Sequence, residues 1–224
     1  MLILAIDTSG KHGSIALVRA EEGEELEVIE CVGLAGGTFS AQLIPQIAEL
    51  LSSQGFSKLD LGAFAVAAGP GSFTGLRIGL AAVKALAEVL QKPIAAVSLL
   101  QVCVLMSGVQ GKVMAVLDAG RGDVYVGEYE VPFSAGGSRL EHMLSRAEFL
   151  EHAKGWTVVS PDAAWIEAGR ATGLAVTALP PITAAEVARQ GWSQVRNGET
   201  VTSEQLEANY IRRTDAEMLE RIGS

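Results

Sequence analysis

The chain has 224 residues, of which 49% are hydrophobic and 19% charged, a balance typical of a globular protein with a substantial core. The formal net charge of −9 argues against direct, tight binding of RNA by this chain alone, because such binding needs cations gathered on one face. No apolar stretch reaches the roughly 18 residues of a membrane span, and the N-terminal MLILAIDTSG lacks a basic leader, so we expect a cytoplasmic location.

The first predicted elements are three strands. Residues 2–7 (LILAID) and 14–18 (SIALV) are apolar runs separated by the turn-prone TSGKHG, which predicts a β-hairpin. Residues 26–34 (LEVIECVGL) follow the acidic EEGEE turn as a third strand. Asp7 thus ends the first strand directly before a turn.

A helix is predicted from Ser40, as its N-cap, to about Ser53, because apolar residues recur there at helical spacing. Those residues are Leu43, Ile44, Ile47, Leu50 and Leu51. A buried strand at 63–69 (AFAVAAG) then leads through the loop GPGSFTG into a second helix at about 73–91, which Pro93 ends.

The second helix carries more apolar surface than one sheet face can cover. Its polar stripe is narrow, and Gly75 and Gly79, four residues apart, let another backbone approach closely. A neighbouring helix of the same chain, a partner subunit, or both would provide the cover. We therefore predict a partner interface on the two helices, made of Ser40, Ile44, Ile47, Gly75, Ile78, Gly79 and Ala82.

The second half of the chain opens like the first. Residues 112–131 read as strand, glycine-rich turn and strand, and AVLD at 115–118 repeats the pattern of LAID at 4–7, which suggests two similar halves. Further elements are predicted as helices near 146–153, 162–172 and 184–197 and a strand at TVVS. We expect an N-terminal subdomain at 1–106 and a reduced C-terminal subdomain at 107–202, with a helix at about 203–224 returning to the first.

Few residues suggest chemistry. Asp7 and Asp118 each end a strand before a turn, where a carboxylate can bind a metal and phosphates or can simply accept backbone amides. The loop GPGSFTG at 69–75 is neither a P-loop nor a dinucleotide fingerprint, and its Ser72 or Thr74 can cap the helix. Helix capping and tight packing are its expected uses.

The metal-ligating residue types show no metal-binding spacing. His12, His142 and His152 are scattered and no HxxxH, HExxH or CxxC occurs, so no metal site and no cofactor are expected. Cys31 and Cys103 each stand in apolar company, which predicts buried, reduced thiols.

Four segments resemble the bacterial TsaB (YeaZ) proteins over nearly the full length of the chain. They are ILAIDTS at the N-terminus, GPGSFTGLRIGLAAVKALA at 69–87, LDAGRGDVYVGEY at 117–129 and NYIRR at 209–213. The resemblance implies an α/β fold of the two-domain actin, sugar-kinase and heat-shock type, which is ribonuclease-H-like, with mixed sheets and flanking helices. It also makes Asp7, Thr8, Ser9 and Asp118 candidate vestigial nucleotide-binding residues.

The same resemblance implies partners. In this family the protein supports TsaD, a paralogous enzyme that transfers threonylcarbamoyl to the adenosine beside the tRNA anticodon, together with the ATPase TsaE. We therefore expect a heterodimer with TsaD, a homodimer of the protein alone, contact with tRNA only through the complex, and no membrane association.

The pattern of the enzyme indicates a non-catalytic relative. Aligned without gaps from the GPG onward, the metal-binding HxxxH of TsaD falls on Leu99 and Cys103, which cannot replace a histidine pair. The family often has His-Ser where this chain has Phe39-Ser40. Two alternatives are a kinase of the same fold that uses Asp7 and Asp118 with magnesium, and a glycoprotease-like metallopeptidase, against which the missing ligand pair argues.

Overall fold

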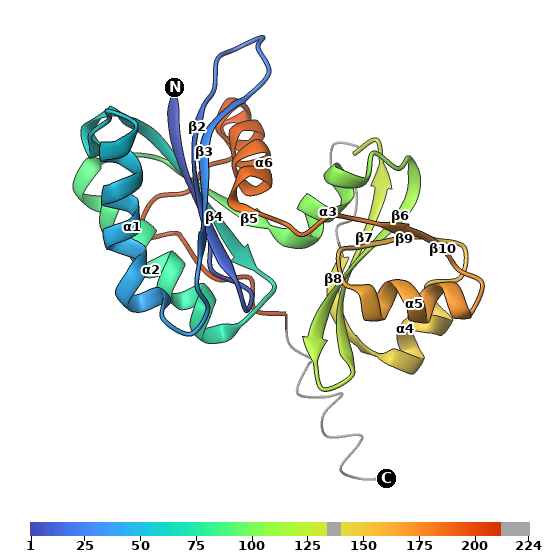
Figure 1. The fold of residues 1–224 in the computed structure, drawn as a ribbon. Helices are drawn as coiled ribbons and strands as arrows, with labels where there is room; N and C mark the ends of the chain where they lie inside the picture. The colour runs from blue at the N-terminus through green and yellow to red at the C-terminus, as the bar shows by residue number, and fades with distance from the viewer. Residues whose placement is uncertain (134–139, 212–224) are drawn as a thin grey trace. The chain divides into compact units, whose positions relative to one another are not determined.

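The computed structural model describes residues 1–133 and 140–211, which form two compact units (Figure 1). The first unit comprises Met1–Val102 and Ile182–Asn209, and the second comprises the described residues between Cys103 and Pro181 with Tyr210 and Ile211. The expected boundary at residue 106 lies close to this division. Residues 182–202 differ from expectation, because helix α6 (Ala184–Asn197) packs on the sheet of the first unit.

The first unit is built on a five-stranded mixed sheet of order β3-β2-β1-β4-β5. Its strands are β1 (Leu2–Asp7), β2 (Gly13–Arg19), β3 (Glu27–Leu34), β4 (Leu61–Gly69) and β5 (Ile94–Ser98). Strand β1 pairs antiparallel with β2 and parallel with β4, so it lies at the centre and every residue in it is buried. The predicted hairpin and third strand are confirmed.

Helices cover both faces of this sheet (Figure 1). Helices α1 (Phe39–Ser53) and α2 (Phe73–Leu90) pack on one face, over a core that includes Leu4 and Ile6 of β1. Helix α6 covers the other face, where residues are small enough for close approach: a Cβ added to Gly191 would lie 2.5 Å from the Cβ of Ala65. A short 3-10 helix, η1 (Lys58–Asp60), precedes β4.

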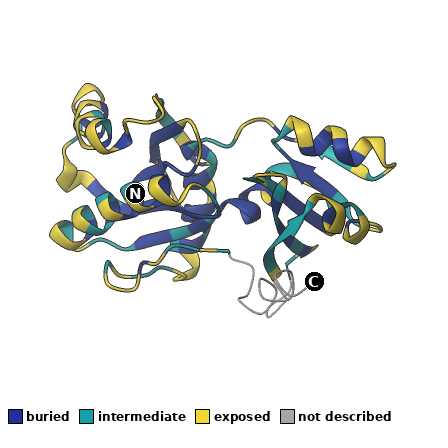
Figure 2. Ribbon diagram, turned by 90° about the horizontal axis from the view of Figure 1, so that it is seen from below, coloured by how far each residue is buried: buried dark blue, intermediate teal, exposed yellow. Residues whose placement is uncertain are grey.

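The start of α1 differs from prediction. Its N-cap is Thr38, and Ser40 lies inside the first turn, exposed to solvent. The predicted helices at 73–91 and 184–197 are confirmed, with side-chain caps from Ser72 and Thr183. Figure 2 shows the resulting burial, with buried strands at the centre of each unit and exposed outer helix surfaces.

The second unit repeats this plan with a sheet of order β10-β9-β6-β7-β8. Its elements are β6 (Gly111–Gly120), β7 (Asp123–Val131), β8 (Leu140–Ser145), α4 (Arg146–His152), β9 (Thr157–Ser160), α5 (Ala163–Ala171) and β10 (Ala175–Ala178). Helices α4 and α5 pack on one face, around Phe149 and Trp165. Strands β8 and β10 were not predicted. Helix α3 (Leu99–Ser107) spans the division between the units.

The two sheets have the same topology. In each, three antiparallel strands are followed by two strands parallel to the first, and an aspartate, Asp7 or Asp118, stands at or near the end of that first strand. This is the repeated strand order of the ribonuclease-H-like, actin-like fold, so the predicted fold class is confirmed.

The chain beyond α6 stays in the first unit as far as Asn209, as irregular structure. Val201 bridges to Ile94, and the Asn209 amide donates to the Ala68 carbonyl at 2.7 Å. The predicted helix at 203–224 is not helical over 203–211, and its remainder lies outside the described residues. Within the described part of the chain, no helix has the length and apolar character to cross a membrane. Cys103 is buried as predicted, whereas Cys31, on β3, is exposed.

Candidate functional site

The turn after β1 is held by its own side chains. Asp7 Oδ1 accepts hydrogen bonds from the Ser9 amide at 2.9 Å and from Ser9 Oγ at 2.6 Å. Burial raises the pKa of the Asp7 carboxyl, and the bonds from Ser9 lower it to a smaller extent. Thr8 Oγ1 donates to the Gly75 carbonyl at 2.7 Å. The side chains of Asp7, Thr8 and Ser9, which are candidate nucleotide-binding residues, therefore make hydrogen bonds within the turn and to the start of α2.

The glycines of the GPGSFTG segment permit this contact. A Cβ added to Gly75 would lie 2.0 Å from the Thr8 carbonyl oxygen, and one added to Gly79 would lie 2.5 Å from Thr8 Oγ1. A Cβ at Gly71 would meet Ser9 at 2.7 Å. The sequence prediction that Gly75 and Gly79 face a partner is thus corrected: both are buried against β1 of their own unit.

The other predicted interface residues divide into two groups. Ile47 is buried in the core of the first unit, so its placement on a partner surface is also corrected. Ser40 and Ile44 are exposed, and Ile78 and Ala82 are half-buried at the rim of that core.

Helices α1 and α2 each present an exposed row with little charge. On α1 the row is Ala41, Ile44, Pro45 and Ala48, which follow helical spacing, and Ile44 is 51% exposed. On α2, residues at every fourth position are exposed: Phe73, Arg77, Ala81, Ala85 and Val89. The Arg77 guanidinium, the one charge in these rows, lies 3.6 Å from the centroid of the Phe73 ring. We call these two rows the α1/α2 surface.

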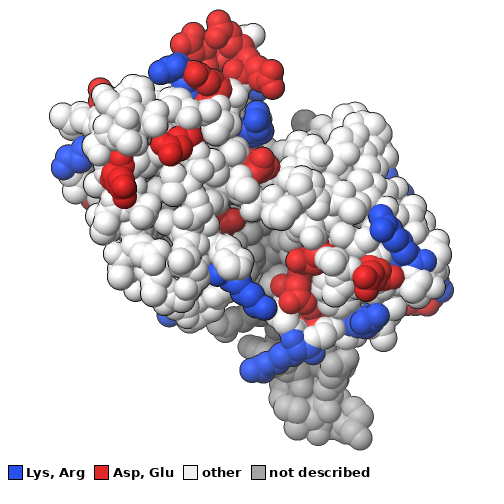
Figure 3. Space-filling view, in the orientation of Figure 1, with Lys and Arg blue, Asp and Glu red and all other residues white. Residues whose placement is uncertain are grey.

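The charge around this surface is low. Figure 3 shows mainly uncharged atoms over α1 and α2, whereas acidic side chains gather at the turn between β2 and β3. A contiguous exposed apolar patch of low charge is suited to a protein-protein contact.

The second unit has its own aspartate cluster. Trp165 Nε1 donates to Asp118 Oδ1 at 3.1 Å, and the Asp118 amide donates to Asp162 Oδ2 at 2.8 Å. Burial raises the pKa of Asp162, the hydrogen bond from Asp118 lowers it and the Asp118 charge raises it further. Asp118 and Asp7 lie in different units, and each is tied into its own unit by hydrogen bonds.

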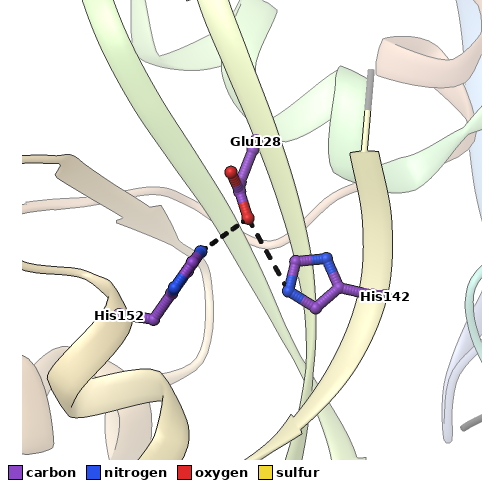
Figure 4. Close-up of side chains that lie close together, drawn as sticks. All are labelled: Glu128, His142 and His152. Atoms are coloured by element: carbon purple, nitrogen blue, oxygen red, sulfur yellow. Dashed lines mark hydrogen bonds and ion pairs between the residues drawn. The ribbon is translucent and has the colours of Figure 1, made fainter. Parts of the chain in front are cut away.

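Two histidines that have no metal-binding spacing in the sequence lie close together in the structure. His142 and His152 converge on Glu128 in the second unit (Figure 4). His12 is exposed in the first unit. No sequence motif indicates this cluster, because its three residues lie on β7, β8 and α4 without any short-range spacing.

Comparison with known proteins identifies the family. A family model described as tRNA N6-adenosine threonylcarbamoyltransferase, TsaD, matches residues 33–151. The tRNA threonylcarbamoyladenosine biosynthesis protein TsaB of Escherichia coli is 30% identical over 231 residues, which cover 95% of this chain and 95% of that protein. The chain belongs to the TsaB (YeaZ) family.

Two further relatives support the same family assignment. The TsaB protein of Bacillus subtilis is 38% identical over 131 residues, which cover 58% of this chain and 56% of that protein. The solved structure of YeaZ from Pseudomonas aeruginosa superposes with a TM-score of 0.70 at 27% identity and covers 94% of this chain and 99% of that one.

Helix α3 lies within the region that the TsaD family model matches. Leu99 and Cys103, which the resemblance suggests stand in place of the enzyme's histidine pair, are both buried. Burial raises the pKa of the Cys103 thiol far above its usual range, and the Asp162 charge adds to this effect. A thiol held in its neutral form is a poor metal ligand.

Proposed function

We propose that this TsaB-family chain acts in tRNA threonylcarbamoyladenosine biosynthesis as a non-catalytic subunit. In this proposal it works in the cytoplasm, binds TsaD through the α1/α2 surface, and supports that enzyme together with the ATPase TsaE. The name of the Escherichia coli relative, which matches over 95% of both chains, supports the pathway.

The observation that carries the scaffold role is the exposed apolar row on α1. Ile44 leaves about half of its side chain in water, and three further apolar residues at helical spacing flank it. Single exposed apolar residues are common, but a continuous row of them on a helix is favourable only when a partner covers it. TsaD is the proposed partner, and the same surface would join two copies when TsaD is absent.

The non-catalytic role rests on the side chains that the enzyme pattern would need. Leu99 offers no donor atom, and Cys103 is buried with its thiol held protonated. Asp7 Oδ1 already accepts two hydrogen bonds from Ser9. These features support a chain that positions an enzyme rather than one that performs the transfer.

The test is reconstitution of threonylcarbamoyl transfer to tRNA with TsaD, TsaE, ATP and an activated threonylcarbamoyl donor, with and without this chain. We expect product only when this chain and TsaD are both present, and none from this chain alone. Transfer at the full rate without this chain would contradict the scaffold role, and transfer without TsaD would contradict the non-catalytic one. Sedimentation of the pure chain would measure whether it dimerises.

A further inference from the structure

Three side chains that can bind a metal converge at one edge of the second unit (Figure 4). They are Glu128 on β7, His142 on β8 and His152 at the end of α4. In the antiparallel register, Val126 lies opposite His142 and Glu128 lies opposite Leu140. Glu128 and His142 are therefore diagonal neighbours on the same face of the sheet.

Helix α4 brings the third residue to this face. Its Phe149, and Ala153 directly after its end, are buried in the core of the second unit, which fixes the last turn over β7 and β8. His152 lies in that turn, with its side chain half exposed. The cluster thus rests on three packed elements.

The distances between the three donor atoms suit a cation with tetrahedral coordination. Glu128 Oε1 lies 2.8 Å from His152 Nε2 and 3.7 Å from His142 Nε2, and the three donor atoms all lie within 4.8 Å of one another. Zinc bonds of about 2.0–2.2 Å in tetrahedral geometry place neighbouring donors roughly 3.3–3.6 Å apart. The two distances from Glu128 bracket that value, so small side-chain rotations would complete the site.

Burial and charge favour a cation at this position. The Glu128 side chain is only 17% exposed, and its ion-pair partners among the described residues are these two histidines. A largely buried carboxylate is stabilised by a positive neighbour. A divalent cation that binds all three groups supplies that positive charge.

We propose that Glu128, His142 and His152 form a Zn²⁺ site that joins β7, β8 and α4. Two imidazoles and one carboxylate are a donor set that zinc accepts, and three protein ligands leave a fourth position for water. This site departs from the sequence expectation of no metal and is independent of the proposed function. Because the metal binds the folded unit, it stabilises that unit.

The experiment is a calorimetric titration of the full chain, free of any affinity tag, with ZnCl₂, followed by melting curves with and without the metal. We expect one Zn²⁺ per chain with a dissociation constant in the micromolar range and a higher melting temperature. His152→Ala changes a half-exposed side chain and should leave the metal-free protein folded. It should weaken binding at least about tenfold, and Glu128→Gln should do the same.

Two control variants test other ligands. His12→Ala removes the third histidine and Cys31→Ser removes the exposed thiol, and both should keep the affinity of the unchanged protein. X-ray absorption at the zinc edge should show two imidazoles and otherwise oxygen ligands. The proposal is overturned if binding does not saturate below about 1 mM, if His152→Ala and Glu128→Gln bind as tightly as the unchanged protein, or if a control variant loses the metal.

Discussion

Thr8 Oγ1 donates a 2.7 Å hydrogen bond to the carbonyl of Gly75, which joins the end of β1 to the first turn of α2. The Ser72 amide adds a second link by donating to the Ser9 carbonyl at 2.7 Å. The helix can come this close to the strand because Gly75 has no side chain. The GPGSFTG segment is thus a packing element of the first unit.

Gly75→Ala should destabilise the protein by about 3 kcal/mol or more, because the new Cβ would lie 2.0 Å from the Thr8 carbonyl oxygen, a backbone atom. Gly33→Ala is the matched control: nothing lies within 4 Å of a Cβ there, and a change within about 0.5 kcal/mol is expected. Urea unfolding measures both. Equal stability of the two variants would disprove the close contact.

Thr8→Val should cost about 1 kcal/mol of unfolding free energy, because it keeps the shape of the side chain and removes the donor to Gly75. Thr74→Val, at an exposed position in the first turn of α2, serves as its control and should have a smaller effect. Unfolding by denaturant, followed by circular dichroism, measures the difference. A Thr8→Val variant as stable as the unchanged protein would show that the bond contributes nothing.

Asp7→Asn should change how stability depends on pH. Burial raises the Asp7 pKa above its ordinary value of 3.8, so the folded state holds this proton to higher pH than the unfolded chain does. The resulting stability is fully present below the unfolded pKa and is lost as pH rises through the folded one. Asp7→Asn has no carboxyl group to titrate at this position, so it does not lose this contribution to stability as the pH rises.

The unfolding free energy of Asp7→Asn, relative to the unchanged protein, should therefore increase as the pH rises from about 4 toward neutrality. Denaturant unfolding at several pH values measures the two curves. Other groups with a raised pKa, such as Asp162, are common to both proteins and cancel in the difference. A constant difference across this range would mean that the Asp7 pKa is not raised.

Ile44→Asp should weaken binding of TsaD at least about tenfold, because it places a charge in the apolar row of α1. The folded chain alone should lose less than about 1 kcal/mol, since Ile44 is already half exposed. Leu140→Asp is the matched control, with 53% exposure on β8 of the second unit. Titration calorimetry with TsaD compares the three proteins, and equal affinities would place the partner surface elsewhere.

Much of the fold was predictable from local pattern. Apolar runs separated by turn residues predicted the hairpin of β1 and β2, and the helix predicted at 184–197 is α6, which the structure shows to be capped by Thr183. The unit to which α6 belongs was not predictable. Nothing local in Gly191 indicates that it packs on Ala65, more than a hundred residues earlier in the chain.

The site shows the same limit. Gly75 and Gly79 correctly indicate a close approach of backbones, but the sequence cannot say whether the approaching backbone belongs to a partner or to β1. Ile44 fits the apolar spacing of α1 and yet lies on its outer side, because the helix turns Leu43 and Ile47 toward the core. The histidine cluster requires the β7–β8 register, which no short motif encodes.

The second unit interrupts the first in sequence, since Met1–Val102 and Ile182–Asn209 together make one body. During synthesis on the ribosome, α6 is made only after the whole of Cys103–Pro181 has been translated. The first sheet therefore lacks this helix until then. Until then the face of that sheet formed by residues such as Ala5, Ala65 and Ala95 has no helix over it. The first unit can therefore complete its core only after the inserted unit has been synthesised.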